Sequence, residues 1–185
     1  MKKIAVMLAD GFEEIEALTV VDVLRRGGMT CHTVSIAAST VTGSHGIPVI
    51  ADKTLSDGIA DYDMIVLPGG LPGATNLRDC PEVIAYIKAF DEDPEKYVAA
   101  ICAAPMCFAQ AGIATGRTIT SYPDDEYRAL FTDANYIEDL VAVDGHMITS
   151  RGPATTLEFA FTLLEALGGD STGLREGMQY NRLLS

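Results

Sequence analysis

Val98-Ala-Ala-Ile-Cys-Ala-Ala-Pro105 is a short apolar run that ends in a thiol, two alanines and a proline. The run predicts a buried strand, and Pro105 predicts the first turn of a helix, where its missing N–H is not needed. Cys102 then lies at the bend between strand and helix, which is the geometry of a nucleophile elbow. The positive end of the helix dipole leads us to expect that the thiolate of Cys102 is favoured. The alternative is a buried cysteine that packs as a small hydrophobic residue.

Length, composition and charge narrow the class of protein. The 185 residues, 48% of them hydrophobic, are expected to form one globular domain over residues 1–185. A net charge of −13 without a basic run argues against nucleic acid and anionic membranes as partners. No apolar run has the length of a membrane span, and no signal peptide is expected. The four cysteines show neither zinc-site nor disulfide-framework spacing, which favours a reduced, cytoplasmic protein.

Strand-like runs alternate with helical patterns along the chain. Strands are expected at Lys3–Ala9, Thr30–Ile36, Met64–Leu67, Val98–Ile101 and Arg117–Thr120. Helices are expected at Glu14–Arg26, Pro81–Phe90, Pro105–Ala111, Pro123–Phe131, Thr155–Leu167 and Ser171–Asn181. Hairpins are expected within Thr40–Ala51 and Val141–Thr149. This alternation predicts an α/β domain with a mainly parallel sheet and helices on both faces.

Ligands of such sheets bind at the carboxyl ends of the strands. That rule brings together three loops: Asp10–Glu16, Pro68–Asn76 and Cys102–Met106. In the first loop, Glu16 shares a helical face with apolar residues and can point inward. A buried glutamate has a raised pKa and can serve as general acid and base. The alternative is a solvated acidic residue at a helix N-terminus.

The second loop is rich in glycine, and backbone N–H groups there can point into the cleft. The N–H groups of Gly70 and Ala103 are candidates for an oxyanion hole beside Cys102. A phosphate cradle is weakly supported, because the loop lacks the Walker lysine and the dinucleotide spacing. A plain turn after a strand is the remaining alternative.

Four segments resemble the ThiJ/PfpI superfamily: Ala9–Glu16, Val66–Gly70, Ala99–Pro105 and Thr149–Pro153. They occur in order over nearly the whole chain and resemble the branch of the human parkinsonism-associated deglycase and its bacterial relatives. The resemblance implies a flavodoxin-like three-layer sandwich of the class I glutamine amidotransferase-like type, and a homodimer. It also implies a catalytic Cys102, a protonated Glu16, and oxyanion-hole amides at Gly70 and Ala103.

One position departs from the family pattern. Many members carry a histidine on the segment that matches Thr120–Pro123, where this chain has Tyr122. A Cys-His-acid triad is then not available from this segment, so Glu16 is expected to move protons alone.

Other candidates for substrate or supporting contacts are Gly69, Tyr122, Arg151 and His45. Arg151 is expected to bind a substrate carboxylate or to cap a loop. His45 matches a position where relatives often have arginine. We hypothesise that it approaches Cys102 of the partner subunit, the alternative being a solvated turn histidine.

The chemistry expected of these residues is a glyoxalase or deglycase reaction on 2-oxoaldehydes or early glycation adducts, through a hemithioacetal on Cys102. The partners are then small reactive carbonyls or glycated proteins, and no metal or cofactor is expected. The alternative is a redox-sensing stress protein or holdase chaperone that uses oxidation of Cys102. A cysteine peptidase or amidotransferase-like hydrolase is a third possibility, weakened by Tyr122.

Overall fold

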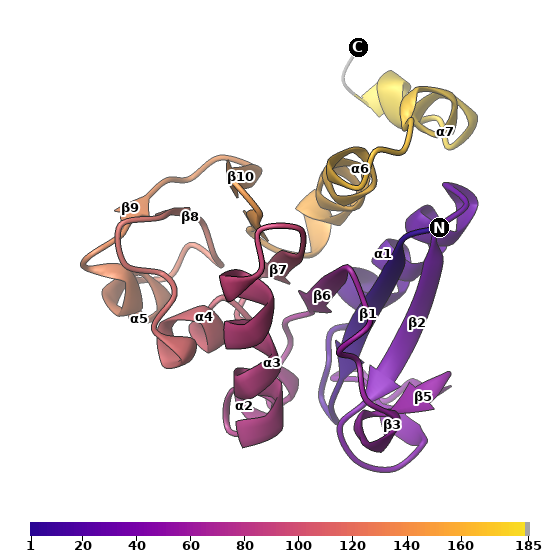
Figure 1. Cartoon of the computed structure of the whole chain (residues 1–185). Coiled ribbons are helices and arrows are strands. Elements are labelled where there is room, and N and C mark those ends of the chain that lie inside the picture. The colour runs from indigo at the N-terminus through magenta and orange to yellow at the C-terminus, as the bar shows by residue number, and fades with distance from the viewer. Residues whose placement is uncertain (184–185) are drawn as a thin grey trace.

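A seven-stranded sheet forms the centre of the computed structural model, which describes residues 1–183 (Figure 1). The strands are β1 (Lys3–Leu8), β2 (Thr30–Ser35), β5 (Lys53–Thr54), β6 (Met64–Leu67), β7 (Tyr97–Ile101), β10 (Val141–Asp144) and β11 (Met147–Ser150). Their order across the sheet is β10-β11-β7-β6-β1-β2-β5. Every neighbouring pair is parallel except β10 and β11. The prediction of a mainly parallel sheet is therefore confirmed.

Helices cover both faces of this sheet. One face packs against α1 (Glu14–Arg26) and α6 (Thr156–Ala166). The other packs against α2 (Gly73–Arg78), α3 (Pro81–Glu92) and α4 (Met106–Ala111). The fold is thus a three-layer α/β sandwich, as the alternation of strands and helices predicts.

Strand β1 shows how one short apolar segment serves both layers. Ile4, Val6 and Leu8 belong to the core under α1 and α6, whereas Ala5 and Met7 belong to the core on the other face. Successive side chains of a strand point to opposite faces, so a continuous apolar run is required when both faces are covered.

Smaller elements lie outside the central sheet. Two further two-stranded sheets form: an antiparallel hairpin of β3 (Thr40–Thr42) and β4 (Pro48–Ile50), and a parallel pair of β8 (Thr118–Ile119) and β9 (Asn135–Tyr136). Short α-helices are α5 (Asp125–Arg128) and α7 (Thr172–Gly177). Turns of 3-10 helix occur at Leu55–Asp57, Ala129–Phe131, Pro153–Thr155 and Tyr180–Leu183.

Three predicted segments differ in detail from the structure. The expected loop Pro68–Asn76 is already helical from Gly73, which packs so closely on the first loop that a Cβ would lie 2.5 Å from the Phe12 nitrogen. The expected helix Pro123–Phe131 is shortened to α5 and a 3-10 turn. The last expected helix is interrupted after Gly177, since glycine is unfavourable inside helices.

The carboxyl ends of β1, β6 and β7 lie side by side, because β6 pairs in parallel with both neighbours. The loops that follow these strands pack backbone against backbone. At Gly70, with φ +83°, a Cβ would collide with the Glu13 nitrogen. The sequence prediction that these three loops converge is confirmed.

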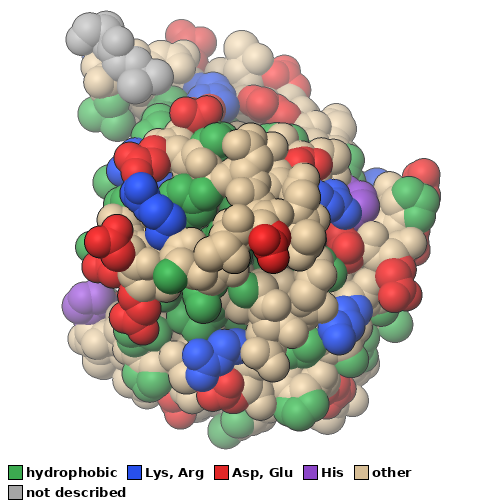
Figure 2. All heavy atoms as spheres, turned by 90° about the vertical axis from the view of Figure 1, so that its left-hand side faces the viewer, with side chains coloured by type: hydrophobic (Ala, Val, Ile, Leu, Met, Phe, Trp, Pro, Cys, Tyr) green, Lys and Arg blue, Asp and Glu red, His purple; other side chains and the backbone are tan. Residues whose placement is uncertain are grey.

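Within residues 1–183, no helix combines the length and the apolar character needed to cross a bilayer. Figure 2 shows the face that bears α5, β8 and β9, with acidic and basic side chains interspersed among small hydrophobic groups. Charges of both signs therefore lie close together on this face.

Replacement of Phe159 by alanine tests the core between α6 and the sheet. Phe159 is completely buried, so Phe159→Ala is expected to lower the free energy of unfolding by about 3–5 kcal/mol. Urea denaturation measures the effect. The exposed Val143 on β10 provides the control, for which Val143→Ala changes stability by less than about 0.5 kcal/mol. Equal effects of the two substitutions would contradict the assignment of this core.

Candidate active site

Cys102 lies directly after β7 and has a strained backbone. Its φ of +63° is in the left-handed region, which residues with a side chain seldom adopt. Two hydrogen bonds fix it there: the Cys102 N–H donates to the Ser150 carbonyl at 3.0 Å, and the Cys102 carbonyl accepts from the Tyr122 N–H at 2.8 Å. The strand ends at Ile101 and α4 begins at Met106, so the predicted elbow between strand and helix is confirmed as geometry.

Glu16 enters the same cleft from the first turn of α1. Its side chain is completely buried, which confirms the inward orientation expected from the helical pattern. One carboxylate oxygen, Oε2, accepts a hydrogen bond of 2.7 Å from the Gly69 N–H. The other oxygen, Oε1, is buried without a normal hydrogen bond.

Only the backbone of Gly69 lies between the side chains of Cys102 and Glu16. A Cβ at this position would lie 2.7 Å from the Cys102 Cβ and 2.7 Å from Glu16 Oε2. The contact requires a residue without a side chain, since real Cβ atoms do not approach so closely. Gly69 therefore lets the thiol and the carboxyl group meet.

The two groups shift one another's ionisation. Burial raises the pKa of the Glu16 carboxyl to about 7, although hydrogen bonds from Gly69 and Cys102 oppose the rise. Burial also raises the pKa of the Cys102 thiol well above its usual range, and the charge of Glu16 adds to this effect. The expectation that the helix dipole favours the thiolate is wrong in direction, because desolvation of the buried sulfur outweighs it.

Backbone amides face the thiol from two loops. Hydrogen bonds from the N–H groups of Ala103 and Gly70 to Cys102 lower its pKa and partly offset burial. These are the two amides that the sequence predicts as oxyanion-hole donors. N–H groups that stabilise a negative sulfur are also placed to stabilise negative charge on an oxygen beside it.

Tyr122 and Arg151 line a common hollow beside the elbow, together with residues 152–155. The Tyr122 ring is 46% exposed and packs edge-to-face on Tyr127, with ring centroids 6.2 Å apart. The Arg151 Nη1 donates to the Glu138 carbonyl at 3.0 Å, so its guanidinium caps a loop while bordering the hollow. Both alternatives for Arg151 therefore remain compatible with the structure.

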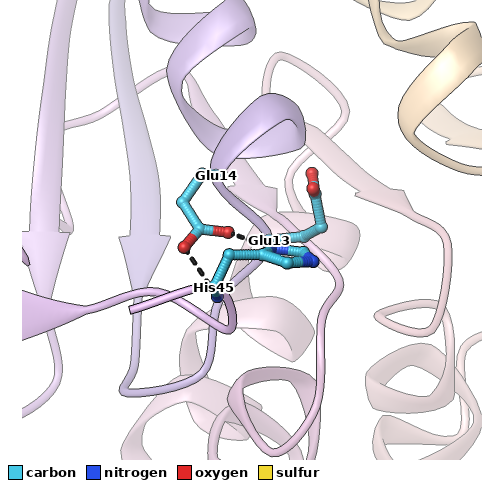
Figure 3. A group of neighbouring side chains, drawn as sticks. All are labelled: Glu13, Glu14 and His45. Carbon is cyan, nitrogen blue, oxygen red and sulfur yellow. Dashed lines mark hydrogen bonds and ion pairs between the residues drawn. The ribbon is translucent and has the colours of Figure 1, made fainter. Parts of the chain in front are cut away.

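His45 lies in the turn between β3 and β4 and contacts its own chain. Figure 3 shows its ring beside Glu14, which comes from the start of α1. The ring Nδ1 lies 2.8 Å from Glu14 Oε2, and the His45 N–H donates to Glu14 Oε1 at 2.8 Å. The imidazole is largely exposed, and its approach to Cys102 of the partner subunit stays a prediction.

Two residues of this region were missed by sequence reasoning. Glu13 is buried and caps α1, where its side chain accepts from the Glu16 N–H at 2.8 Å. The spacing Glu13-x-x-Glu16 is the available signal, because a residue at the N-cap accepts from the N–H three positions on.

Tyr127 is the second residue that was missed. Burial raises the pKa of Tyr127, and the nearby Cys102 adds to the rise. Its position on α5 has no such signal in the sequence.

The remaining cysteines lie in ordinary packing positions, and all four cysteines are free. Burial raises the pKa of Cys31 and of Cys107 to about 12, which makes both thiols unreactive. Cys80 is partly exposed just before α3, as expected.

The protein is thus a flavodoxin-like α/β sandwich. Its site combines a cysteine on a strained turn between strand and helix with a buried carboxyl group beside it. The chain belongs to the DJ-1/PfpI family, whose model matches residues 2–166. The family assignment made from the four sequence segments is confirmed.

Similar proteins come from several eukaryotes. The chain is 40% identical to the Parkinson disease protein 7 homolog of Danio rerio, with 91% of this chain and 90% of that protein covered. It is 32% identical to the glutathione-independent glyoxalase DJR-1.2 of Caenorhabditis elegans, covering 85% of this chain and 83% of the other. The crystal structure of Drosophila melanogaster DJ-1beta superposes with a TM-score of 0.90 at 34% identity, covering 96% and 97% of the two chains.

Some relatives are longer. Protein DJ-1 homolog A of Arabidopsis thaliana is 39% identical over 91% of this chain, which spans only 43% of that protein. For homolog B of the same plant the chain spans 39%.

The raised pKa of Glu16 predicts a pH-dependent gain in stability for Glu16→Gln. The unfolded carboxyl group ionises near pH 4.5 and the folded one near pH 7, so ionisation costs the wild type stability as pH rises through this window. We expect the stability of Glu16→Gln, relative to wild type, to increase by about 2 kcal/mol between pH 5 and pH 8. Urea unfolding at both pH values measures this difference. The exposed Glu92 supplies the control Glu92→Gln, and the same pH trend in both variants would refute the assignment.

Proposed function

We propose that this protein is a cysteine-dependent, cofactor-independent glyoxalase or deglycase, which acts on 2-oxoaldehydes or early glycation adducts. The observation that carries the proposal is the contact of Cys102 with Glu16 across Gly69. It places a nucleophile beside a carboxyl group with a pKa of about 7, which can both accept and donate a proton near neutral pH.

The first step forms a hemithioacetal. The Cys102 sulfur adds to the aldehyde carbon while the thiol proton passes to the Glu16 carboxylate. The carbonyl oxygen takes the electron pair of its π bond, and the N–H groups of Gly70 and Ala103 stabilise it until Glu16 passes the proton on to it and becomes a carboxylate again. Transfer of the proton neutralises the Glu16 carboxylate, which removes the charge that contributes to the high pKa of the thiol.

The second step moves hydrogen between two carbons. The Glu16 carboxylate removes the proton from the carbon that bears sulfur, and the resulting enediol is protonated at the neighbouring carbon. The former aldehyde carbon is now oxidised to a thioester, and the former ketone carbon is reduced to an alcohol. Water then hydrolyses the thioester to a 2-hydroxy acid and returns the free thiol, so no external oxidant or reductant is consumed.

The comparisons support the glyoxalase chemistry at the level of the family. The glutathione-independent glyoxalase name belongs to the Caenorhabditis elegans relative, which this chain matches over most of its length. For glycation adducts, the open hollow at Tyr122 and Arg151 offers space for a bound amino-acid side chain next to the elbow.

Methylglyoxal turnover to lactate tests the proposal. We expect Cys102→Ser and Glu16→Gln each to lower kcat/KM by about 100-fold or more, because one variant lacks the thiol and the other the proton carrier. The partly exposed Cys80 gives the matched control Cys80→Ser, which should retain wild-type turnover.

Full turnover by Cys102→Ser would overturn the mechanism. A wild-type protein without turnover above background would instead favour the redox-sensor alternative. Mass spectrometry of Cys102 after peroxide treatment would then detect the sulfenic or sulfinic acid expected of a sensor.

The homodimer implied by the family is also a proposal, and a surface of α1 and α6 supports it. Ile15 is 54% exposed and lines a shallow apolar hollow with Leu18, Pro153, Leu157 and Met178. Exposed apolar surface of this kind is typical of an interface between proteins. A second copy of the chain is the proposed occupant.

Substitution of Ile15 by glutamate tests the dimer. Placing a charge in an apolar interface should dissociate it, so Ile15→Glu is expected to halve the molar mass found by light scattering. The exposed Leu130 on the other side of the fold provides the control Leu130→Glu, which should leave the molar mass unchanged. A monomeric wild type would contradict the proposal.

A further inference from the structure

Three side chains with metal-binding atoms gather at the start of α1, apart from the Cys102–Glu16 pair. They are Glu13 and Glu14 of the first loop and His45 of the β3–β4 turn (Figure 3). We infer that these three residues form a binding site for a divalent first-row transition-metal ion of the Zn²⁺ type. The inference departs from the sequence expectation that the protein binds no metal.

The distances suit one shared ion. One oxygen of each carboxylate and one ring nitrogen all lie within 4.8 Å of one another. Zinc binds oxygen and nitrogen at about 2.0–2.2 Å, so ligands on one ion are separated by roughly 3–4 Å. The ligand atoms would have to move closer together by up to roughly 1–2 Å to reach this range.

The burial of Glu13 is a separate reason to expect a cation, since Glu14 already pairs with His45. Glu13 and Glu14 are only 7% and 6% exposed, and neither pairs with a lysine or arginine among residues 1–183. Glu13 uses one oxygen, Oε2, to cap α1, and its Oε1 accepts no hydrogen bond from the described residues. Buried charges are normally paired or coordinate a metal ion, and a carboxylate of Glu13 that lies within 4.8 Å of the other two ligand atoms has one oxygen left to bind a cation.

The backbone around the cluster is already held in place. The Ser44 N–H donates to the Phe12 carbonyl at 2.8 Å, and the Gly11 N–H donates to the Thr42 carbonyl at 2.8 Å. These bonds fix the β3–β4 turn against the loop before α1, and ligands from two distant segments therefore meet without large rearrangement. A metal ion would tie the same two segments together more firmly.

The donor set selects the class of ion. Two carboxylates and one imidazole suit Zn²⁺ and its first-row neighbours, whereas Mg²⁺ and Ca²⁺ prefer oxygen ligands alone. The competing cation is the proton on His45, whose pKa is raised by the hydrogen bond and charge of Glu14 and by the charge of Glu13. A metal ion would replace that proton.

Binding of Zn²⁺, measured by competition with a chromophoric chelator, tests the site. All proteins carry Cys102→Ser, so that the thiol supplies no ligand. We expect one bound Zn²⁺ per chain in this parent, and binding weakened about tenfold or more by His45→Gln or by Glu13→Gln, which is a loss of about 1.4 kcal/mol or more.

His146→Gln is the matched control, because His146 also pairs with a carboxylate, at 2.9 Å from Asp91, but lies elsewhere. It should leave the affinity unchanged. His45 is exposed, so His45→Gln is expected to fold, and circular dichroism verifies this. As a second readout, Zn²⁺ should raise the Tm of the parent and not that of His45→Gln.

Three outcomes would overturn the inference. They are the absence of stoichiometric Zn²⁺ in the parent, equal affinities of the parent and His45→Gln, and Zn²⁺ binding that occurs only when Cys102 is restored. The last would assign the ion to the thiol. Methylglyoxal turnover does not enter any of these measurements, so failure here leaves the proposed function untouched, and the reverse is also true.

Discussion

The hydrogen bond from the Gly69 N–H to Glu16 is the contact on which the site depends. It joins the loop after β6 to the first turn of α1 and fixes one oxygen of a completely buried carboxyl group. Because Gly69 has no side chain, its backbone also packs directly against Cys102. The parallel pairing of β1, β6 and β7 places Glu16, Gly69 and Cys102 at the same edge of the sheet.

Much of this arrangement follows from local patterns in the sequence. The apolar runs before Cys102 and before Gly69 predict buried parallel strands, and the topology of such sheets brings the following loops together. The inward direction of Glu16 follows from its helical face. The close approach at Gly69 is not a local property, because it depends on the exact separation of three elements that are distant in sequence.

Other features required the tertiary structure. Glu13 and Glu14 look like solvated residues at a helix start, but the β3–β4 turn folds over them from about thirty residues further along the chain. The direction of the Cys102 pKa was mispredicted because a helix dipole is visible in sequence, whereas desolvation of the sulfur is not. Tyr127 is placed by the packing of α5, a helix too short to show a clear period.

The left-handed backbone of Cys102 limits which residues this position can accept. A residue branched at Cβ is far more strained at a φ of +63° than an unbranched one, so threonine is a poor substitute although its hydroxyl is a competent nucleophile elsewhere. Glycine or asparagine would adopt the same backbone with less strain and would stabilise the fold while removing the thiol. The elbow is therefore a position where selection for stability alone would discard the cysteine, and its presence marks a requirement other than folding.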